Sequence, residues 1–173
     1  MKLTDRRWQA AGAAGLLAIA LAAAAVALLA RGNSPQVPAR ASQYTASTAC
    51  LLTDSHGINA APASIVWAGM EDAAMTTHAK ATYLTVNGPD TAANAIPYAN
   101  SLVEERCNVV LAVGTPETSA VTRIAARNPK TTFVIVSDST GFATANLKAI
   151  GFTADTRSQV KQTVEALTAS TVT

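Results

Sequence analysis

Side chains that could bind a polar ligand or transfer a proton follow directly on the apolar run at 49–53. They are Asp54, Ser55, His56 and Gly57. Nucleophilic catalysis would need a third group to orient adjacent Ser55 and His56, and no G-x-S-x-G pattern surrounds this serine. We therefore expect a binding site and not an enzyme, and a hydrolase built on Ser55 and His56 is kept as a third hypothesis.

Polar residues and glycines also follow the other apolar runs of the sequence. If these runs are parallel strands, their carboxyl ends meet at one edge of the sheet, where doubly wound folds bind ligands. Glycine lets a ligand approach the backbone, and Asp54 and Asp138 can accept hydrogen bonds from hydroxyl groups. The competing interpretation is that such residues only cap helices and form turns. The predicted ligand-binding residues are Asp54, Ser55, His56, Gly57, Asn59, Gly114, Thr115 and Asp138.

Several classes of site have no motif in this sequence. Neither a G-x-G-x-x-G signature nor a P-loop follows the first run, and there is no Cys-x-x-Cys pair or metal-ligand cluster. The run at 109–113 ends at Gly114, where a phosphate-accepting receiver domain would need an aspartate. We expect no cofactor and no bound metal.

Apolar runs alternate with segments of helical periodicity after residue 48. Such alternation predicts βαβ units and a three-layer α/β/α sandwich, with a five-stranded parallel sheet in the order 2-1-3-4-5. The helix that begins at 115 is expected to take Thr115 as its cap and Pro116 and Glu117 in its first turn. The expected strands are 49–53, 81–86, 108–114, 131–136 and 147–152, and the expected helices are 62–75, 91–105, 115–128 and 155–168.

The two cysteines test this strand order. Cys50 lies at the start of the first strand and Cys107 just before the third, so in the order 2-1-3-4-5 the two residues are neighbours. In an oxidising compartment we expect them to form a disulfide. Two buried free thiols are the alternative.

The first 48 residues differ in composition from the rest. No charged residue occurs from 8 to 30, and Lys2, Arg6 and Arg7 precede this stretch. We expect a cytoplasmic tip at 1–7, a transmembrane signal-anchor helix at 8–30, a linker at 31–48 and an extracytoplasmic domain at 49–173. Cleavage after a small-residue site such as 25–27 would instead release a secreted domain.

The charge of the predicted domain argues against a nucleic-acid partner. The whole chain has a formal charge of +2, but from Ser42 onward acidic side chains outnumber basic ones. Nucleic-acid binding requires a basic surface, and no basic cluster occurs in this part of the sequence.

Several short motifs, in order, resemble the first lobe of the basic membrane protein family of ABC-transporter substrate-binding proteins. The resemblance covers about residues 49–155 and implies a periplasmic-binding-protein lobe with a nucleoside-like ligand facing Asp54, Gly57 to Asn59, Gly114 and Asp138. The family's Asp-Lys-Ser-Phe-Asn is replaced here by the residues at 60–64, so the aromatic side chain that stacks on a base is absent. The motifs are Cys50 to Asp54, His56 to Asn59, Trp67 to Met70, Asn108 to Gly114, Pro129 to Phe133 with Asp138, and Asn146 to Phe152.

Two principal hypotheses follow from these observations. The first is a membrane-anchored, extracytoplasmic domain that binds a small polar solute, with a nucleoside as the ligand that the resemblance implies. Because the sequence holds one lobe, a second copy of the chain or a membrane partner is expected to complete the site. The second is an interaction or structural module that has kept the fold and lost the ligand.

Overall fold

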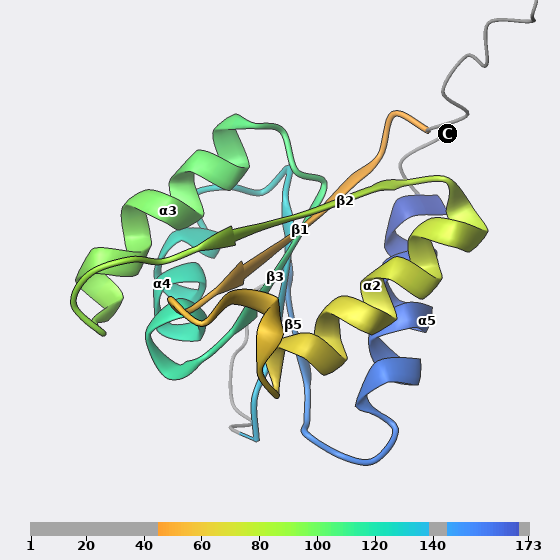
Figure 1. Cartoon of the computed structure of the whole chain (residues 1–173). Helices are drawn as coiled ribbons and strands as arrows, with labels where there is room; N and C mark the ends of the chain where they lie inside the picture. Colours follow the sequence, from red (N-terminus) through yellow and green to blue (C-terminus); the bar gives the residue numbers. More distant parts are fainter. Residues whose placement is uncertain (1–44, 139–144, 170–173) are drawn as a thin grey trace, which may run out of the picture. The chain divides into compact units, whose positions relative to one another are not determined.

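The sheet that organises the chain consists of five parallel strands in the order β2-β1-β3-β4-β5, as predicted. The computed structural model describes residues 45–138 and 145–169 (Figure 1). The strands are β1 (Thr48–Thr53), β2 (Lys80–Thr85), β3 (Val109–Val113), β4 (Thr132–Val136) and β5 (Leu147–Ile150).

Helices cover both faces of this sheet and complete the predicted three-layer sandwich. In Figure 1, α3 and α4 lie over one face, and α2 and α5 lie over the other. The short 3₁₀ helix η1 connects β1 to α2. The bounds are η1 (Gly57–Asn59), α2 (Ala63–Thr77), α3 (Ala92–Glu104), α4 (Thr115–Ala125) and α5 (Thr156–Ala169).

The continuous apolar character of the central strands is explained by burial on both faces. Successive side chains of a strand point to opposite faces, so Cys50 and Leu52 pack with α3 and α4, whereas Leu51 packs with α2 and α5. Every residue of β3 is buried. The edge strand β2 is half-buried or exposed at all its positions, which agrees with its weaker apolar pattern.

The folded unit extends further toward the N-terminus than the sequence pattern indicates. The linker was predicted to continue through residue 48, but β1 begins at Thr48 and Ser47 is buried. The Ser47 hydroxyl donates to the carbonyl of Thr168, and the Thr45 N–H donates to the carbonyl of His78. These polar residues are held by partners distant in sequence, which a local pattern does not reveal.

Two elements end two or three residues earlier than predicted. The helix expected to reach Asn128 ends at Ala125, and the strand expected to reach Phe152 ends at Ile150. The N–H of Phe152 donates to the side chain of Asp138 at 3.0 Å, so a loop carboxylate is the partner of this amide.

The predicted cytoplasmic tip, signal-anchor helix and most of the linker lie outside the described residues. Within 45–138 and 145–169, no helix is both long enough and apolar enough to cross a membrane.

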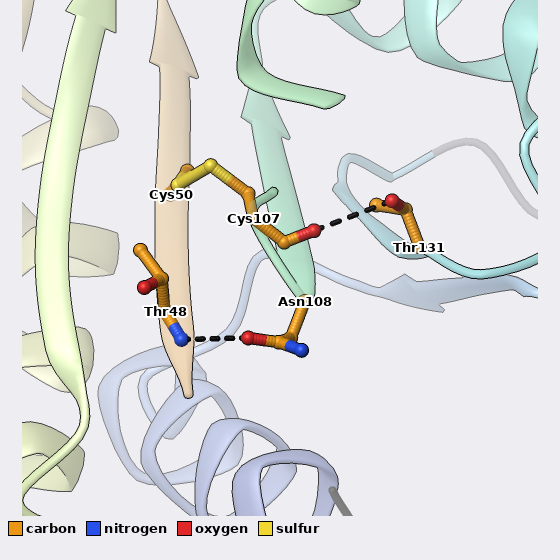
Figure 2. Close-up of a disulfide and its surroundings, with 5 residues drawn as sticks. All are labelled: Thr48, Cys50, Cys107, Asn108 and Thr131. Carbon is orange, nitrogen blue, oxygen red and sulfur yellow. Dashed lines mark hydrogen bonds between the residues drawn. A yellow bond between two sulfur atoms is a disulfide. The ribbon is translucent and has the colours of Figure 1, made fainter. Parts of the chain in front are cut away.

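The predicted disulfide between Cys50 and Cys107 is present (Figure 2). It joins the start of β1 to the residue two positions before β3, and its Cα atoms are 6.0 Å apart. Beside it, Asn108 Oδ1 accepts a hydrogen bond from the Thr48 N–H at 2.8 Å. Disulfides persist in oxidising compartments, which places this unit outside the cytoplasm.

Helices α2 and α5 are in close contact at Gly69. A Cβ atom there would lie 2.6 Å from the Arg157 carbonyl oxygen and 3.0 Å from Val160. Next to this contact, the Arg157 guanidinium donates two hydrogen bonds to the Asp72 carboxylate, at 2.7 and 2.9 Å. These hydrogen bonds lower the pKa of Asp72 below its ordinary value.

Replacing Gly69 by alanine should therefore destabilise the protein by about 1–2 kcal/mol. Overpacking a tight contact costs about 1–3 kcal/mol, and the better helix propensity of alanine returns at most about 1 kcal/mol. Urea unfolding followed by circular dichroism measures the change. Gly151→Ala is the control, because a Cβ atom there meets nothing within 4 Å. A Gly69→Ala variant as stable as the parent would show that the helices can separate at no cost.

Candidate functional site

The predicted site lies where the strand order reverses. The chain leaves β1 toward β2 on one side and leaves β3 toward β4 on the other, and doubly wound sheets bind their ligands at such a point. Leu52 pairs with Ala112 in the β1–β3 register. Asp54 and Gly114, each two residues further along, therefore end neighbouring strands side by side. We call residues 54–59 and 114–117, together with Asp138, the rim.

The first loop of the rim is a tight turn held by its own hydrogen bonds. Asp54 Oδ1 accepts from the His56 N–H at 2.8 Å and lies 3.3 Å from His56 Nδ1. The Gly57 N–H donates to the Asp54 carbonyl, and Gly57 has a φ of 64°, which favours glycine. The side chain of Asp54 is half-exposed. The loop thus presents Ser55, His56 and Asn59 to solvent.

Asp138 lies at the same edge of the sheet as Asp54, as predicted, with β3 between their strands. It is exposed, and its Oδ1 accepts from the Phe152 N–H. Both aspartates therefore have one oxygen that accepts a hydrogen bond from a loop backbone. This agrees with the alternative interpretation, in which such residues only stabilise turns and helix ends. A carboxylate accepts on both oxygens, so each can also accept from a ligand.

The third part of the rim differs in one detail from the prediction. Gly114, and not Thr115, is the N-cap of α4, with φ 106° and ψ 150°. Thr115 is the first helical residue and is exposed, and Pro116 lies in the first turn as predicted. A backbone at this positive φ strains residues other than glycine, so a side chain at the cap position would be unfavourable.

A residue that the sequence analysis did not select, Glu117, is the most unusual group at the rim. Its side chain is only 1% exposed, and among the described residues its Oε2 has no hydrogen-bond partner. The carboxyl folds back over Gly114, where a Cβ atom would overlap Oε2. Burial raises the pKa of Glu117, its own N–H opposes this shift, and the charges of Asp54 and Asp90 raise the pKa further.

The sequence contained one signal for this arrangement. An acid in the first turn of a helix normally interacts with the helix dipole while exposed, and Glu117 was predicted to lie in such a first turn. The glycine three positions earlier is what allows the carboxyl to lie inward, because it offers no side chain to keep the carboxyl away.

Glu117→Gln should stabilise the folded protein at neutral pH by on the order of 1 kcal/mol, because an unpartnered buried charge costs more than an amide of the same shape. The folded-state pKa lies above the ordinary value of 4.5, so folding favours the protonated form. Stability should fall as the pH rises from 4.5 through the folded-state pKa, and the variant should lack this slope. Urea unfolding between pH 4 and 8 measures the difference, with exposed Glu104→Gln as the control. Equal slopes in the variant and the parent would contradict the burial of a charge.

The described residues show no cluster of side chains suited to a metal ion. Among them, no three His, Cys, Asp or Glu side chains are grouped so that they could hold a metal ion. The imidazole of His56 lies against Asp54 on an exposed turn. The other histidine, His78, ends α2 at the opposite edge of the sheet.

A groove of about 400 Å³ lies elsewhere, between the edge strand β5 and helix α5. Lys148, Ile150, Gln159 and Thr163 are among the residues that line it. None of the predicted ligand-binding residues contributes to this groove. We base the site on the rim, because the groove lies away from the strand ends at the switch point, where doubly wound sheets bind their ligands.

Comparisons with known proteins identify the fold. No protein-family model matches the sequence, and no curated protein matches it significantly. A fragment of a predicted lipoprotein from Peptoclostridium difficile 630 superposes with a TM-score of 0.57 at 16% identity, over 73% of this chain and 99% of that one. The likeness establishes the fold alone.

Two transcription regulators are similar at a lower level. An activator of the comK gene from Bacillus halodurans has a TM-score of 0.46 at 17% identity, over 60% of this chain and 34% of its own. A predicted LacI-family repressor from Corynebacterium glutamicum has a TM-score of 0.49 at 12% identity, over 75% of this chain and 50% of its own.

Proposed function

We propose that this chain is an extracytoplasmic binding lobe, anchored in the membrane by residues 8–30, that takes a small polar solute at the rim. The observation that carries the proposal is the position of Asp54 beside Gly114 and the first turn of α4, at the sheet's switch point. Backbone N–H groups, a glycine and a half-exposed carboxylate together suit a ligand with several hydroxyl or amino groups. The disulfide supports an extracytoplasmic location.

The resemblance to the basic membrane protein family favours a nucleoside among such solutes. The residues that carry the resemblance lie in or next to the elements predicted for them. Trp67 and Gly69 lie in α2, Asp54 follows β1 and Asp138 follows β4. The base-stacking aromatic of that family has no counterpart at residues 60–64, so the sugar hydroxyls are the part of the nucleoside that this rim suits best.

A single lobe covers one side of a ligand only. Small-molecule sites generally bury most of the ligand surface, and affinity falls when part of it stays in water. We propose that a second copy of the chain or a membrane partner closes the site.

Titration calorimetry of the full chain with a panel of nucleosides tests this function. We expect binding in the millimolar range or tighter, and Asp54→Asn or Asp138→Asn should weaken it about tenfold, because a hydrogen bond to a charged group is worth about 1.5–3 kcal/mol. Glu104→Gln, at the opposite end of the sheet, should bind like the parent. Absence of heat at millimolar concentrations for every nucleoside would count heavily against the proposal.

An interaction module is the second candidate. The observation that favours it is that both rim aspartates accept hydrogen bonds from loop amides, whereas the groove runs along the edge strand β5. An exposed strand edge can pair with another chain. Under this alternative, Asp54→Asn and Asp138→Asn leave a partner complex intact, and Lys148→Glu weakens it.

A further inference from the structure

The Glu117 carboxyl is a buried acceptor whose capacity is only partly used, since its own N–H is a donor to it. Its Oε2 has no partner within the described part of the chain, although buried polar groups almost always have one. The atom lies against Gly114, the N-cap of the eleven-residue helix α4. Gly114 itself is half-buried and Thr115 is exposed, so a backbone without a side chain separates the carboxyl from the rim surface.

The charged side chains that act on the Glu117 carboxylate are negative, like the carboxylate itself. Asp54 ends the neighbouring strand, Asp90 follows the strand beyond it, and both act electrostatically on Glu117. A helix N-terminus usually attracts anions, but here a glutamate of the helix already occupies that end. His56 is the neighbouring group that can become positive, and its imidazole lies 3.3 Å from Asp54. The rim is therefore unfavourable for a phosphate or carboxylate and favourable for a cation.

We propose that the solute carries a protonated amine, which the Glu117 carboxylate holds at the N-terminus of α4. The inference rests on the proposed binding function and names the chemical class of its ligand. The proposal requires the Glu117 side chain to rotate on binding, so that Oε2 leaves Gly114 for the rim and the ammonium group becomes its donor. Asp54, on the adjacent strand end, accepts a second hydrogen bond from the same ligand.

The test is an NMR titration of the full chain that follows the backbone amides of Gly114, Thr115 and Thr118. The probes are 1,4-diaminobutane for the cation, inorganic phosphate for the anion and uridine for a neutral nucleoside. The diamine should shift these amides at millimolar concentration, and phosphate should leave them in place. Glu117→Gln should weaken diamine binding about tenfold or more, the loss expected when a charge-assisted hydrogen bond is removed. Glu104→Gln should bind like the parent.

Failure of the amine inference can be distinguished from failure of the binding function on which it rests. Uridine binding that depends on Asp54, together with no effect of the diamine, would overturn the amine inference and keep the binding lobe. Phosphate shifting the Gly114 and Thr115 amides, or diamine binding that is unchanged in Glu117→Gln, would overturn it as well. No shift with any probe would overturn both. A thermal melt of Glu117→Gln shows whether a loss of binding is separate from a loss of folding.

Discussion

Removing the disulfide should lower the free energy of unfolding by about 4 kcal/mol. Cys50 and Cys107 close a loop with a sequence separation of 57 residues, and the chain-entropy model gives about 4 kcal/mol for a loop of this length. Domains are typically stable by only about 5–15 kcal/mol, so the loss is a large fraction of the total. Guanidinium unfolding of the full chain with both cysteines replaced by alanine measures it.

Two comparisons separate the cross-link from the packing of its sulfur atoms. The parent protein under reducing conditions keeps both buried side chains and loses only the bond, so it should show most of the loss. Either single alanine variant also lacks the cross-link and should be destabilised nearly as much as the double variant. A double variant within about 1 kcal/mol of the parent would mean that the unfolded chain is already constrained.

The fold was predictable because its strands appear in the sequence as short apolar runs. The runs at 109–113 and 131–136 are too short for helices and lack alternation, and only strands buried on both faces have this pattern. The strand order was tested by the cysteines, since Cys50 and Cys107 meet only if β1 and β3 are neighbours. The disulfide thus confirms the order with information independent of the apolar pattern.

The ends of the elements were less predictable, because their partners are distant in sequence. Ser47 has the composition of the linker and is nevertheless buried, since its hydroxyl reaches the last turn of α5. The Phe152 N–H leaves the β ladder for the Asp138 carboxylate. Neither contact has a signal in the residues on either side.

The sequence indicated that Asp54 and Asp138 lie at the same edge of the sheet, but it did not indicate that Glu117 is buried there. Asp54 and Asp138 lie at one edge because parallel strands end together, a rule that holds for any such sheet. Glu117 has the sequence of an ordinary helix start, and its burial depends on the backbone of Gly114 turning to a φ of 106°. Such a conformation follows from tertiary packing, so the sequence indicated that Glu117 lies in the first turn of a helix and not that its carboxyl is buried.

Asn146 should be the most sensitive polar residue at the edge opposite the rim. Its Nδ2 lies 2.9 Å from the Ala125 carbonyl oxygen, 3.0 Å from that of Asn128 and 2.9 Å from that of Thr131. The amide therefore ties the end of α4 and the start of β4 to the start of β5. Asn146→Asp points a carboxylate at three carbonyl oxygens, and we expect a loss of about 2–3 kcal/mol, because a charged group replaces the donor.

Asn108→Asp is the matched control for this prediction. Asn108 is also half-buried at the amino end of a strand, but its side-chain oxygen is the acceptor for the Thr48 N–H (Figure 2). Aspartate keeps that acceptor, so the control should stay within about 0.5 kcal/mol of the parent, as substitutions that remove no interaction usually do. A carboxyl group that is protonated can donate again, so the penalty at 146 should shrink below pH 4. Equal losses in both variants at neutral pH would show that added charge at this edge, and not the missing donor, destabilises the fold.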